Sequence, residues 1–491
     1  MQHSTKRKIG LALLGAAVCS VVIAFQFAGG SSGTAAGLNG NAAGLAGELA
    51  GDGNVDATLQ PRLDLSPGAK EGRDLILNYS FLPPDFRQET FDDLWRDWPE
   101  PLKSKAKDAT KKQRREMAFK RYGFTPRPDD PTKPMQFVVG DDGGWTMNCF
   151  TCHGGSIKGE MVEGLPNAQI ALETMYADLR RTKKRRGDAF SQMDLGSAAV
   201  PMGTTVGTSN AVVFGIGLMT FRDKDLNLSL RFRPHLLTHH DMDAPAWWNV
   251  RKRKRLYIDG FVERNHRALV PFVMDQLNSG EKMRGWEDEF EKVYAYIKSL
   301  EPPKYPLKVD EDLVAKGKIV FDENCKSCHG TYGKIATYPS KVVPLKKIGT
   351  DAVRLKALTR YDRKVYHESW FAHYGKDETV LDPKGYQAPP LDGVWASAPY
   401  FHNGSVPTIE GVLNSKNRPD IWRANHDGYD FDQVGLEVES YAALPVSIER
   451  SDQRRKYFDA SVRGKGNGGH TFGDKLNSKQ RSAVIEYLKT L

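Results

Sequence analysis

The chain contains the pattern Cys-x-x-Cys-His twice, and this pair of motifs constrains the fold more than any other feature. The two copies are Cys149-Phe-Thr-Cys152-His153 and Cys325-Lys-Ser-Cys328-His329. This spacing is typical of c-type haem attachment. The two sulfurs bond to one edge of a porphyrin, and the histidine that follows turns beneath the ring to coordinate the iron. Two covalently bound haems c are therefore predicted, with His153 and His329 as proximal ligands.

The alternative for these four cysteines is a four-thiolate zinc site or a disulfide. The chain has five cysteines, and the fifth, Cys19, lies in the N-terminal leader. Both motifs end in histidine, and an exported protein has little use for free structural thiolates. Haem attachment is the preferred interpretation.

The leader predicts export. Lys6, Arg7 and Lys8 precede an apolar run over residues 9–28, which indicates a signal peptide or an uncleaved signal anchor over residues 1–28. No second run of this length occurs, which excludes a polytopic membrane protein. Residues 29–64 are rich in Gly and Ala and predict a flexible linker. The expected location is periplasmic or extracellular, either released or anchored to the inner membrane by residues 9–28.

Apolar spacing predicts helices beside both motifs. Residues 313–321 have helical periodicity, and this helix is expected to end at Asn324, just before the second motif. A closing helix is predicted over residues 478–491. A similar stripe over residues 290–300 stops at Pro302-Pro303 and predicts the closing helix of a first haem domain. The predicted fold is mainly α, with two cytochrome-c-like haem domains, 65–303 and 307–491, that carry long loop and helical insertions.

The formal charge is +9, and basic clusters occur at residues 103–121, 180–186 and 251–255. Such runs usually form solvated surface, which is the preferred interpretation. The alternative is docking of an acidic partner or a nucleic acid. No nucleic-acid-binding module accompanies the clusters, so nucleic-acid binding is not expected.

Three further segments carry a family resemblance. They are Asp243-Ala-Pro-Ala-Trp-Trp248 with Tyr257-Ile-Asp-Gly260, Ala398-Pro-Tyr-Phe-His-Asn-Gly-Ser405 with Val406-Pro-Thr408, and Gly469-His470-Thr-Phe-Gly473. Together with the haem motifs, residues 140–491 resemble the bacterial dihaem cytochrome c peroxidase superfamily. The last segment is most similar to the rubber-oxygenase branch. The resemblance implies that His470 is the second axial ligand of the C-terminal haem and that His402 forms a hydrogen bond near it.

The sequence departs from the peroxidase pattern at several positions. No histidine lies between His153 and His235, and no methionine follows Met283. Residues 271–275 lack the glutamate that peroxidases use on peroxide, and Ile258 replaces their bridging tryptophan. These departures weaken the assignment to a simple peroxidase.

The two haems are expected to have different roles. A haem with two strong protein ligands transfers electrons, whereas a haem with one ligand and an open face binds O2 or peroxide. The C-terminal haem has His329 and His470. For the N-terminal haem, His153 has no obvious local partner. The remaining candidates are His235, His239, His240 and His266. The N-terminal haem is therefore predicted to keep an exchangeable position.

Four aromatic residues are predicted to form an apolar distal pocket at the N-terminal haem: Trp247, Trp248, Tyr257 and Phe261. A dry pocket favours bound O2 because charge separation is costly at low dielectric. The alternative is that these aromatics belong to an ordinary core.

Three functions remain open. The first is an oxidoreductase that activates O2 at the N-terminal haem and acts on an apolar organic substrate. The second is a dihaem peroxidase that reduces H2O2. The third is a non-catalytic electron carrier tethered to the membrane. A redox partner protein is expected, and the sequence does not identify it.

Overall fold

The computed structural model describes residues 59–61, 64–229 and 238–491. Residues Leu59–Leu491 form one compact unit. The predictions for residues 1–28, for most of the linker and for His235 lie outside the described residues. The predicted domain boundary at 303–307 lies inside the compact unit and stays a prediction. Within the described part, no helix is long and apolar enough to cross a membrane.

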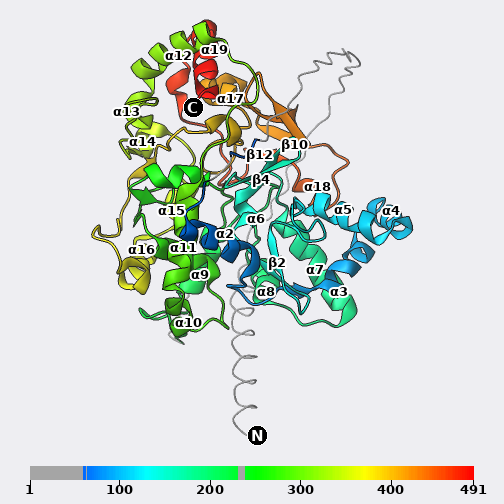
Figure 1. Cartoon of the computed structure of the whole chain (residues 1–491). Helices are drawn as coiled ribbons and strands as arrows, with labels where there is room; N and C mark the ends of the chain where they lie inside the picture. Colours follow the sequence, from blue (N-terminus) through cyan, green and yellow to red (C-terminus); the bar gives the residue numbers. More distant parts are fainter. Residues whose placement is uncertain (1–58, 62–63, 230–237) are drawn as a thin grey trace, which may run out of the picture. The chain divides into compact units, whose positions relative to one another are not determined.

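Helices dominate the fold, but sheets contribute more than expected. The structure is 42% helical and 13% strand, so the prediction of a mainly α fold is confirmed only in part. Before the Pro-rich segment at 302–303, the α-helices are α2 (Pro67–Asn78), α3 (Gln88–Asp93), α4 (Leu102–Asp108), α5 (Lys111–Tyr122), α6 (Phe150–His153), α7 (Leu172–Arg186), α8 (Gln192–Ala199), α9 (Ala211–Met219), α10 (Gly280–Gly285) and α11 (Glu287–Ser299). After it come α12 (Glu311–Asn324), α13 (Lys326–His329), α14 (Leu345–Ile348), α15 (Val353–Ala357), α16 (Arg360–Glu368), α17 (Ile409–Leu413), α18 (Ser451–Arg454) and α19 (Ser478–Lys489) (Figure 1).

The strands are short and antiparallel. One sheet has the order β1-β3-β2, from β1 (Phe86–Arg87), β2 (Phe137–Val139) and β3 (Gly144–Met147). A second has the order β11-β10-β12, from β10 (Ile421–Asp430), β11 (Gly435–Tyr441) and β12 (Phe458–Asp459). Three two-stranded ladders complete the set: β4 (Gly154–Ile157) with β5 (Glu160–Glu163), β6 (Arg255–Leu256) with β7 (Val262–Glu263), and β8 (Val342–Pro344) with β9 (Gly385–Gln387). Most of these strands are only two to four residues long.

Two helix pairs frame the haem motifs. Helix α12 ends at Asn324 as predicted, and it packs on α19. Helix α11 confirms the predicted closing helix before Pro302, and its partner is α2, which lies far upstream of the first motif. In both pairs a glycine stands at the crossing. A methyl group on Gly72 would overlap the carbonyl of Lys292, and one on Gly317 would overlap the carbonyl of Ala483.

The close approach of α2 and α11 predicts a selective effect of alanine. Gly72→Ala is expected to lower the free energy of unfolding by about 1–3 kcal/mol, because the added methyl group must push two helix backbones apart. Gly68, in the first turn of the same helix, has nothing within reach of an added methyl group. Gly68→Ala is therefore expected to leave stability unchanged or to raise it slightly. Urea unfolding measures the stability of the two variants. Equal stabilities would contradict the close approach of α2 and α11 at Gly72.

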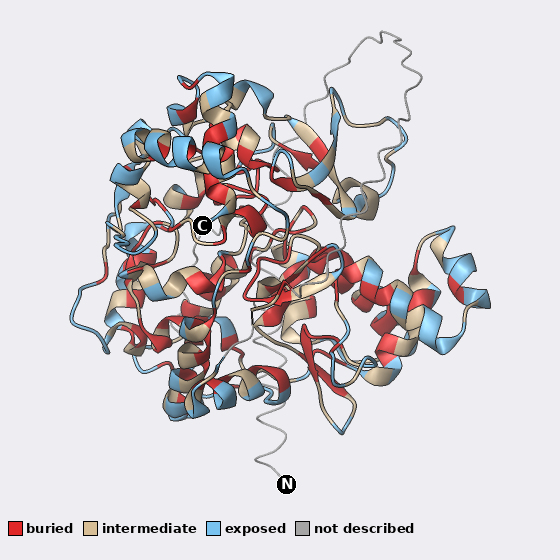
Figure 2. Ribbon diagram, turned by 45° about the horizontal axis from the view of Figure 1, so that its top comes forward, coloured by how far each residue is buried: buried red, intermediate tan, exposed pale blue. Residues whose placement is uncertain are grey.

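The core consists of two groups of buried residues (Figure 2). The larger one joins the helix pairs and both motif regions. The smaller one belongs to residues 86–202 and is rich in aromatics, for example Trp145, which stacks on Phe86 and Phe91. This second core buries the aromatic residues that precede the first motif, among them Trp95 and Trp98.

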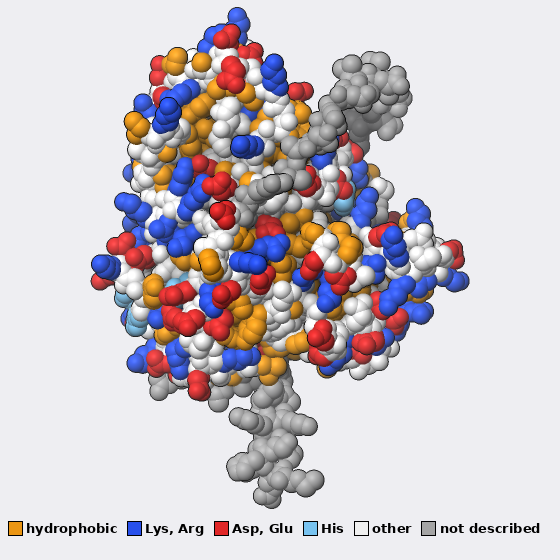
Figure 3. Space-filling view, viewed as in Figure 1, with side chains coloured by type: hydrophobic (Ala, Val, Ile, Leu, Met, Phe, Trp, Pro, Cys, Tyr) orange, Lys and Arg blue, Asp and Glu red, His pale blue; other side chains and the backbone are white. Residues whose placement is uncertain are grey.

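Basic and acidic side chains are interspersed on the face that Figure 3 shows. The basic clusters take part in ion pairs within the chain. Arg121 pairs with Asp178 at 2.7 Å, and Arg185 pairs with Asp97 at 3.0 Å. Intramolecular pairing therefore accounts for part of the clustered positive charge.

Candidate haem sites

The first motif lies between two small sheets. Its residues form the single turn α6, directly after β3 and directly before β4. Nδ1 of His153 lies 3.1 Å from the carbonyl oxygen of Pro245. The imidazole also stacks on Trp247, with ring centres 4.7 Å apart. Desolvation by burial lowers the pKa of His153 to about 4, so the ring is neutral near pH 7.

The second motif repeats this local arrangement. Helix α12 leads into α13, and Nδ1 of His329 lies 2.9 Å from the carbonyl oxygen of Pro389. Burial lowers the pKa of His329 as well. A carbonyl oxygen only accepts hydrogen bonds, so Nδ1 carries the hydrogen in both rings and Nε2 keeps its lone pair. A histidine fixed in this way is oriented to bind a metal through Nε2.

None of the four motif cysteines takes part in a disulfide, and each is partly accessible. Burial raises the pKa of Cys149 to about 12 and that of Cys325 to about 11. Within the described ranges, no cluster of three or more metal-ligating side chains contains a cysteine. Two separate Cys-x-x-Cys-His turns with carbonyl-anchored histidines therefore fit haem c better than a zinc site.

His470 lies opposite the second motif histidine. The ring centres of His329 and His470 are 6.3 Å apart, with an angle of 65° between the ring planes. The backbone of His470 is left-handed (φ 47°), and its N–H donates to the carbonyl of Ile348 at 2.6 Å. Arg418 donates to the carbonyls of Asn467 and Gly469, which fixes this Gly-rich segment in place. Desolvation by burial lowers the pKa of His470 to about 4.

The other candidate histidines have protein partners or closed surroundings. Nδ1 of His239 lies 2.8 Å from the amide nitrogen of Asn210, and its Nε2 lies 3.1 Å from Asp241. His240 is only 1% exposed, and its Nδ1 is bonded to the carbonyl of Thr238. Its Nε2 has no hydrogen-bond partner among the described residues.

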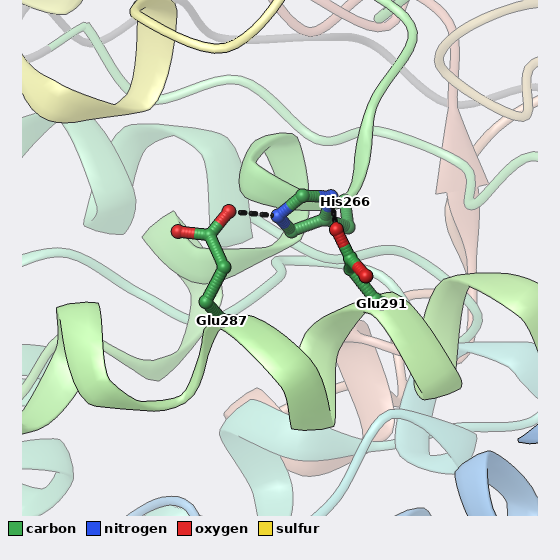
Figure 4. A group of neighbouring side chains, drawn as sticks. All are labelled: His266, Glu287 and Glu291. Atoms are coloured by element: carbon green, nitrogen blue, oxygen red, sulfur yellow. Dashed lines mark hydrogen bonds and ion pairs between the residues drawn. The ribbon is translucent and has the colours of Figure 1, made fainter.

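His266 is held by α11 (Figure 4). Its Nε2 bonds to Glu287, and its Nδ1 lies 4.0 Å from Glu291. These three side chains could hold a metal ion by their spacing, but Arg267 also pairs with Glu287 at 2.9 Å. In the part of the chain that the structure describes, no second histidine ring faces His153 as His470 faces His329.

The structure separates the four predicted pocket aromatics. Trp247 lies against the motif histidine His153, and Trp248 donates its Nε1–H to the carbonyl of Asp392 at 2.7 Å. Only Tyr257 and Phe261 lie together, with ring centres 4.9 Å apart. They line a small apolar cavity with residues of α9, Pro271, Phe272 and Tyr366. The four aromatics therefore do not line a single pocket. The 3-10 turn over Trp247–Lys252 directs Trp247 and Trp248 away from Tyr257 and Phe261.

His402 is buried beside Tyr386, with ring centres 4.4 Å apart. Burial lowers its pKa to about 3. Its Nε2 has no hydrogen-bond partner within the described ranges, so the predicted role near the C-terminal haem stays a prediction.

The two motif regions share a correspondence that is not among the predictions from the sequence. The interval in sequence from Pro245 to Tyr257 is the same as that from Pro389 to Phe401. Tyr257 and Phe401 both have left-handed backbones, with φ of 64° and 69°. Each carbonyl accepts a hydrogen bond from the glycine one turn later, at 3.1 and 3.2 Å. The signal was present as two prolines, each followed at the same distance by an aromatic residue and then by Asp-Gly or Asn-Gly.

Comparisons with known proteins agree with a cytochrome. Residues 385–423, which include Pro389 and Phe401, match a family model described as RoxA-like, cytochrome c-like. This match indicates a cytochrome c-like domain towards the C-terminus and a haem c cofactor. It also supports the resemblance to the rubber-oxygenase branch.

Two curated relatives come from Sinorhizobium fredii. The uncharacterized protein y4iM is 27% identical over 298 residues, which cover 50% of this chain and 64% of y4iM. The uncharacterized protein y4iJ is 25% identical over 259 residues, which cover 39% of this chain and 41% of y4iJ. The matched regions thus span less than two thirds of either relative.

Proposed function

We propose that this protein is a dihaem c-type cytochrome that acts as an oxidoreductase. Cys149, Cys152 and His153 would hold a haem that supplies the chemistry on O2 or peroxide, and Cys325, Cys328, His329 and His470 would hold a haem that transfers electrons. Bound haem iron supplies the oxygen and one-electron chemistry. The chain supplies two attachment turns, neutral axial histidines and an apolar surrounding. The observation that carries the proposal is the difference between the two sites: His470 faces His329, and no described histidine faces His153.

The spacing of His329 and His470 supports a haem ligated on both faces. Two metal–nitrogen bonds of about 2 Å and two ring-centre-to-nitrogen distances of roughly 1.2 Å add up to about 6.4 Å. The observed separation is 6.3 Å. Because both pKa values are lowered, both rings are neutral near pH 7 and keep a lone pair for iron.

An open face at the N-terminal haem is supported by the partners of the other histidines. His239 and His266 make hydrogen bonds to carboxylates, and such bonds would have to break before either ring could turn to an iron. The ligand histidines His153, His329 and His470 each remain partly accessible, whereas His240 is closed in by protein. The cavity beside Tyr257 and Phe261 is apolar and has room for about one water-sized molecule, so it suits a diatomic ligand rather than an organic substrate.

The proposed location is the periplasm or the extracellular space, with residues 9–28 as the leader or anchor. A redox partner protein would exchange electrons at the C-terminal haem.

Product formation from an apolar alkene tests the proposal. The protein is incubated with polyisoprene or smaller alkenes, with and without O2. Products that require O2 are expected, and the Cys149→Ala/Cys152→Ala variant, which cannot attach the N-terminal haem, is expected to form none. Peroxide consumption with a reduced cytochrome as donor is measured in parallel. Peroxide turnover without any alkene product would favour the peroxidase. If the protein shows neither activity, the remaining hypothesis is the electron carrier.

A further inference from the structure

The correspondence between the two motif regions places Tyr257 and Phe401 at equivalent positions. Each follows a proline whose carbonyl anchors the motif histidine, and each adopts a left-handed backbone that L-residues rarely tolerate. Such strain persists only where the surrounding structure enforces it, and it is common at functional sites. The shared conformation therefore indicates a shared placement of the two rings relative to their haems.

Phe401 shows which side of the haem this position faces. Its ring lies 5.9 Å from that of His470, the proposed second ligand, and so on the side away from the motif histidine. By equivalence, Tyr257 lies on the side of the N-terminal haem that is opposite His153.

The same comparison shows what the N-terminal site lacks. In the second half, α19 crosses α12 at Ala483, which contacts Gly317, and His470 lies before Ala483 in the sequence. In the first half, α11 crosses α2 at Lys292, so Lys292 corresponds to Ala483. Counting back from Lys292 by the interval that separates His470 from Ala483 leads to Ser279. Ser279 accepts the backbone N–H of Lys282 at 3.1 Å and caps α10. The first half thus has a phenol at the position of Phe401 and no imidazole at the position of His470.

The hydroxyl of Tyr257 makes only a weak hydrogen bond within the protein. It lies 3.3 Å from the carbonyl oxygen of Ala268, which is long for an O–H donor. The ring packs on Phe261 and lies parallel to Phe272, with centres 6.4 Å apart, and it borders the apolar cavity. Burial raises the pKa of Tyr257, so the phenol keeps its proton and can donate it at neutral pH.

We propose that Tyr257 flanks the open face of the N-terminal haem and donates a hydrogen bond to a small ligand bound there. This inference rests on the proposed function, because it needs an open face. A hydrogen bond to a charged acceptor is among the stronger hydrogen bonds of proteins, and its loss weakens binding about tenfold or more. In an apolar cavity a single phenol would therefore set both the affinity and the orientation of an oxygen-derived or other polar ligand.

Cyanide is a suitable probe, because it is a small anion that accepts a hydrogen bond. Tyr257→Phe keeps the ring and removes the hydroxyl. We expect the dissociation constant for cyanide to rise at least about tenfold. The carbon–oxygen stretching frequency of bound CO is expected to shift in the same variant, which a merely structural role would not produce. Tyr361→Phe, the same change at an exposed tyrosine of α16, is expected to leave the cyanide affinity unchanged.

The outcomes separate the inference from the proposed function. If the wild-type protein binds neither cyanide nor CO, the open face is absent and both ideas fail. If the wild type binds both and Tyr257→Phe changes neither the affinity nor the CO frequency, only the inference fails. Loss of affinity in Tyr366→Phe but not in Tyr257→Phe would assign the donor to the other phenol of the cavity and would overturn the inference as well.

Discussion

Replacing Cys325 and Cys328 with alanine is expected to reduce the covalently bound haem from two per chain to one. The thioether bonds of each haem come from one Cys-x-x-Cys pair, so removal of both sulfurs removes one attachment site completely. The Cys149→Ala/Cys152→Ala variant is expected to give the same count. Pyridine haemochrome spectra, recorded after acid–acetone extraction of unattached haem, measure the number directly.

The two variants are expected to differ in ligand binding. The variant without the C-terminal haem keeps its site for cyanide, whereas the variant without the N-terminal haem loses it. Cys19→Ala serves as the control, because this cysteine belongs to neither motif. A wild-type chain that carries one covalent haem, or zinc in place of haem, would show that one of the motifs has another role.

Replacing His470 with alanine is expected to open the C-terminal haem. Removal of the ring that faces His329 leaves that iron with one protein ligand, and a five-coordinate haem binds small ligands. The number of cyanide ions bound per chain should rise from one to two, and the low-spin signal in the electron paramagnetic resonance spectrum should fall sharply. The spectrum is recorded on the ferric sample before cyanide is added, and the number of bound cyanide ions is then measured on the same sample.

His426→Ala is the matched control for this change. His426 is exposed and pairs with the neighbouring Asp427, far from either motif in the sequence. It is expected to leave the cyanide count at one. An unchanged count in His470→Ala would mean that another group ligates the C-terminal iron.

The parts of the fold that the sequence predicted are local ones. Helices α11, α12 and α19 carry their apolar stripes and their stop signals within a few turns, so periodicity alone identifies them. The partner of α11 could not be found in this way. Helix α2 precedes the first motif and α11 follows it at a distance, and the glycine that permits their contact looks like any other in the sequence. The short strands were not predicted for a related reason. A segment of two to four residues shows too little hydrophobic periodicity to be recognised as a strand.

In the candidate sites, too, only the local features could be predicted from the sequence. The attachment motifs are recognisable because covalent chemistry fixes their spacing, but the carbonyl partners Pro245 and Pro389 emerge only from the folded chain. The sequence predicts Trp247 in a distal pocket because it lies in the Asp243–Trp248 segment, which carries the family resemblance. The structure instead stacks it on His153, because the backbone turns immediately after Pro245.

Electron paramagnetic resonance of the ferric wild-type protein, with and without cyanide, tests the central claim most directly. The account predicts one low-spin haem that cyanide does not change and one open, high-spin haem that cyanide converts to low spin. Two low-spin haems that both ignore cyanide would contradict it, because a side chain would then occupy the sixth position of the N-terminal iron.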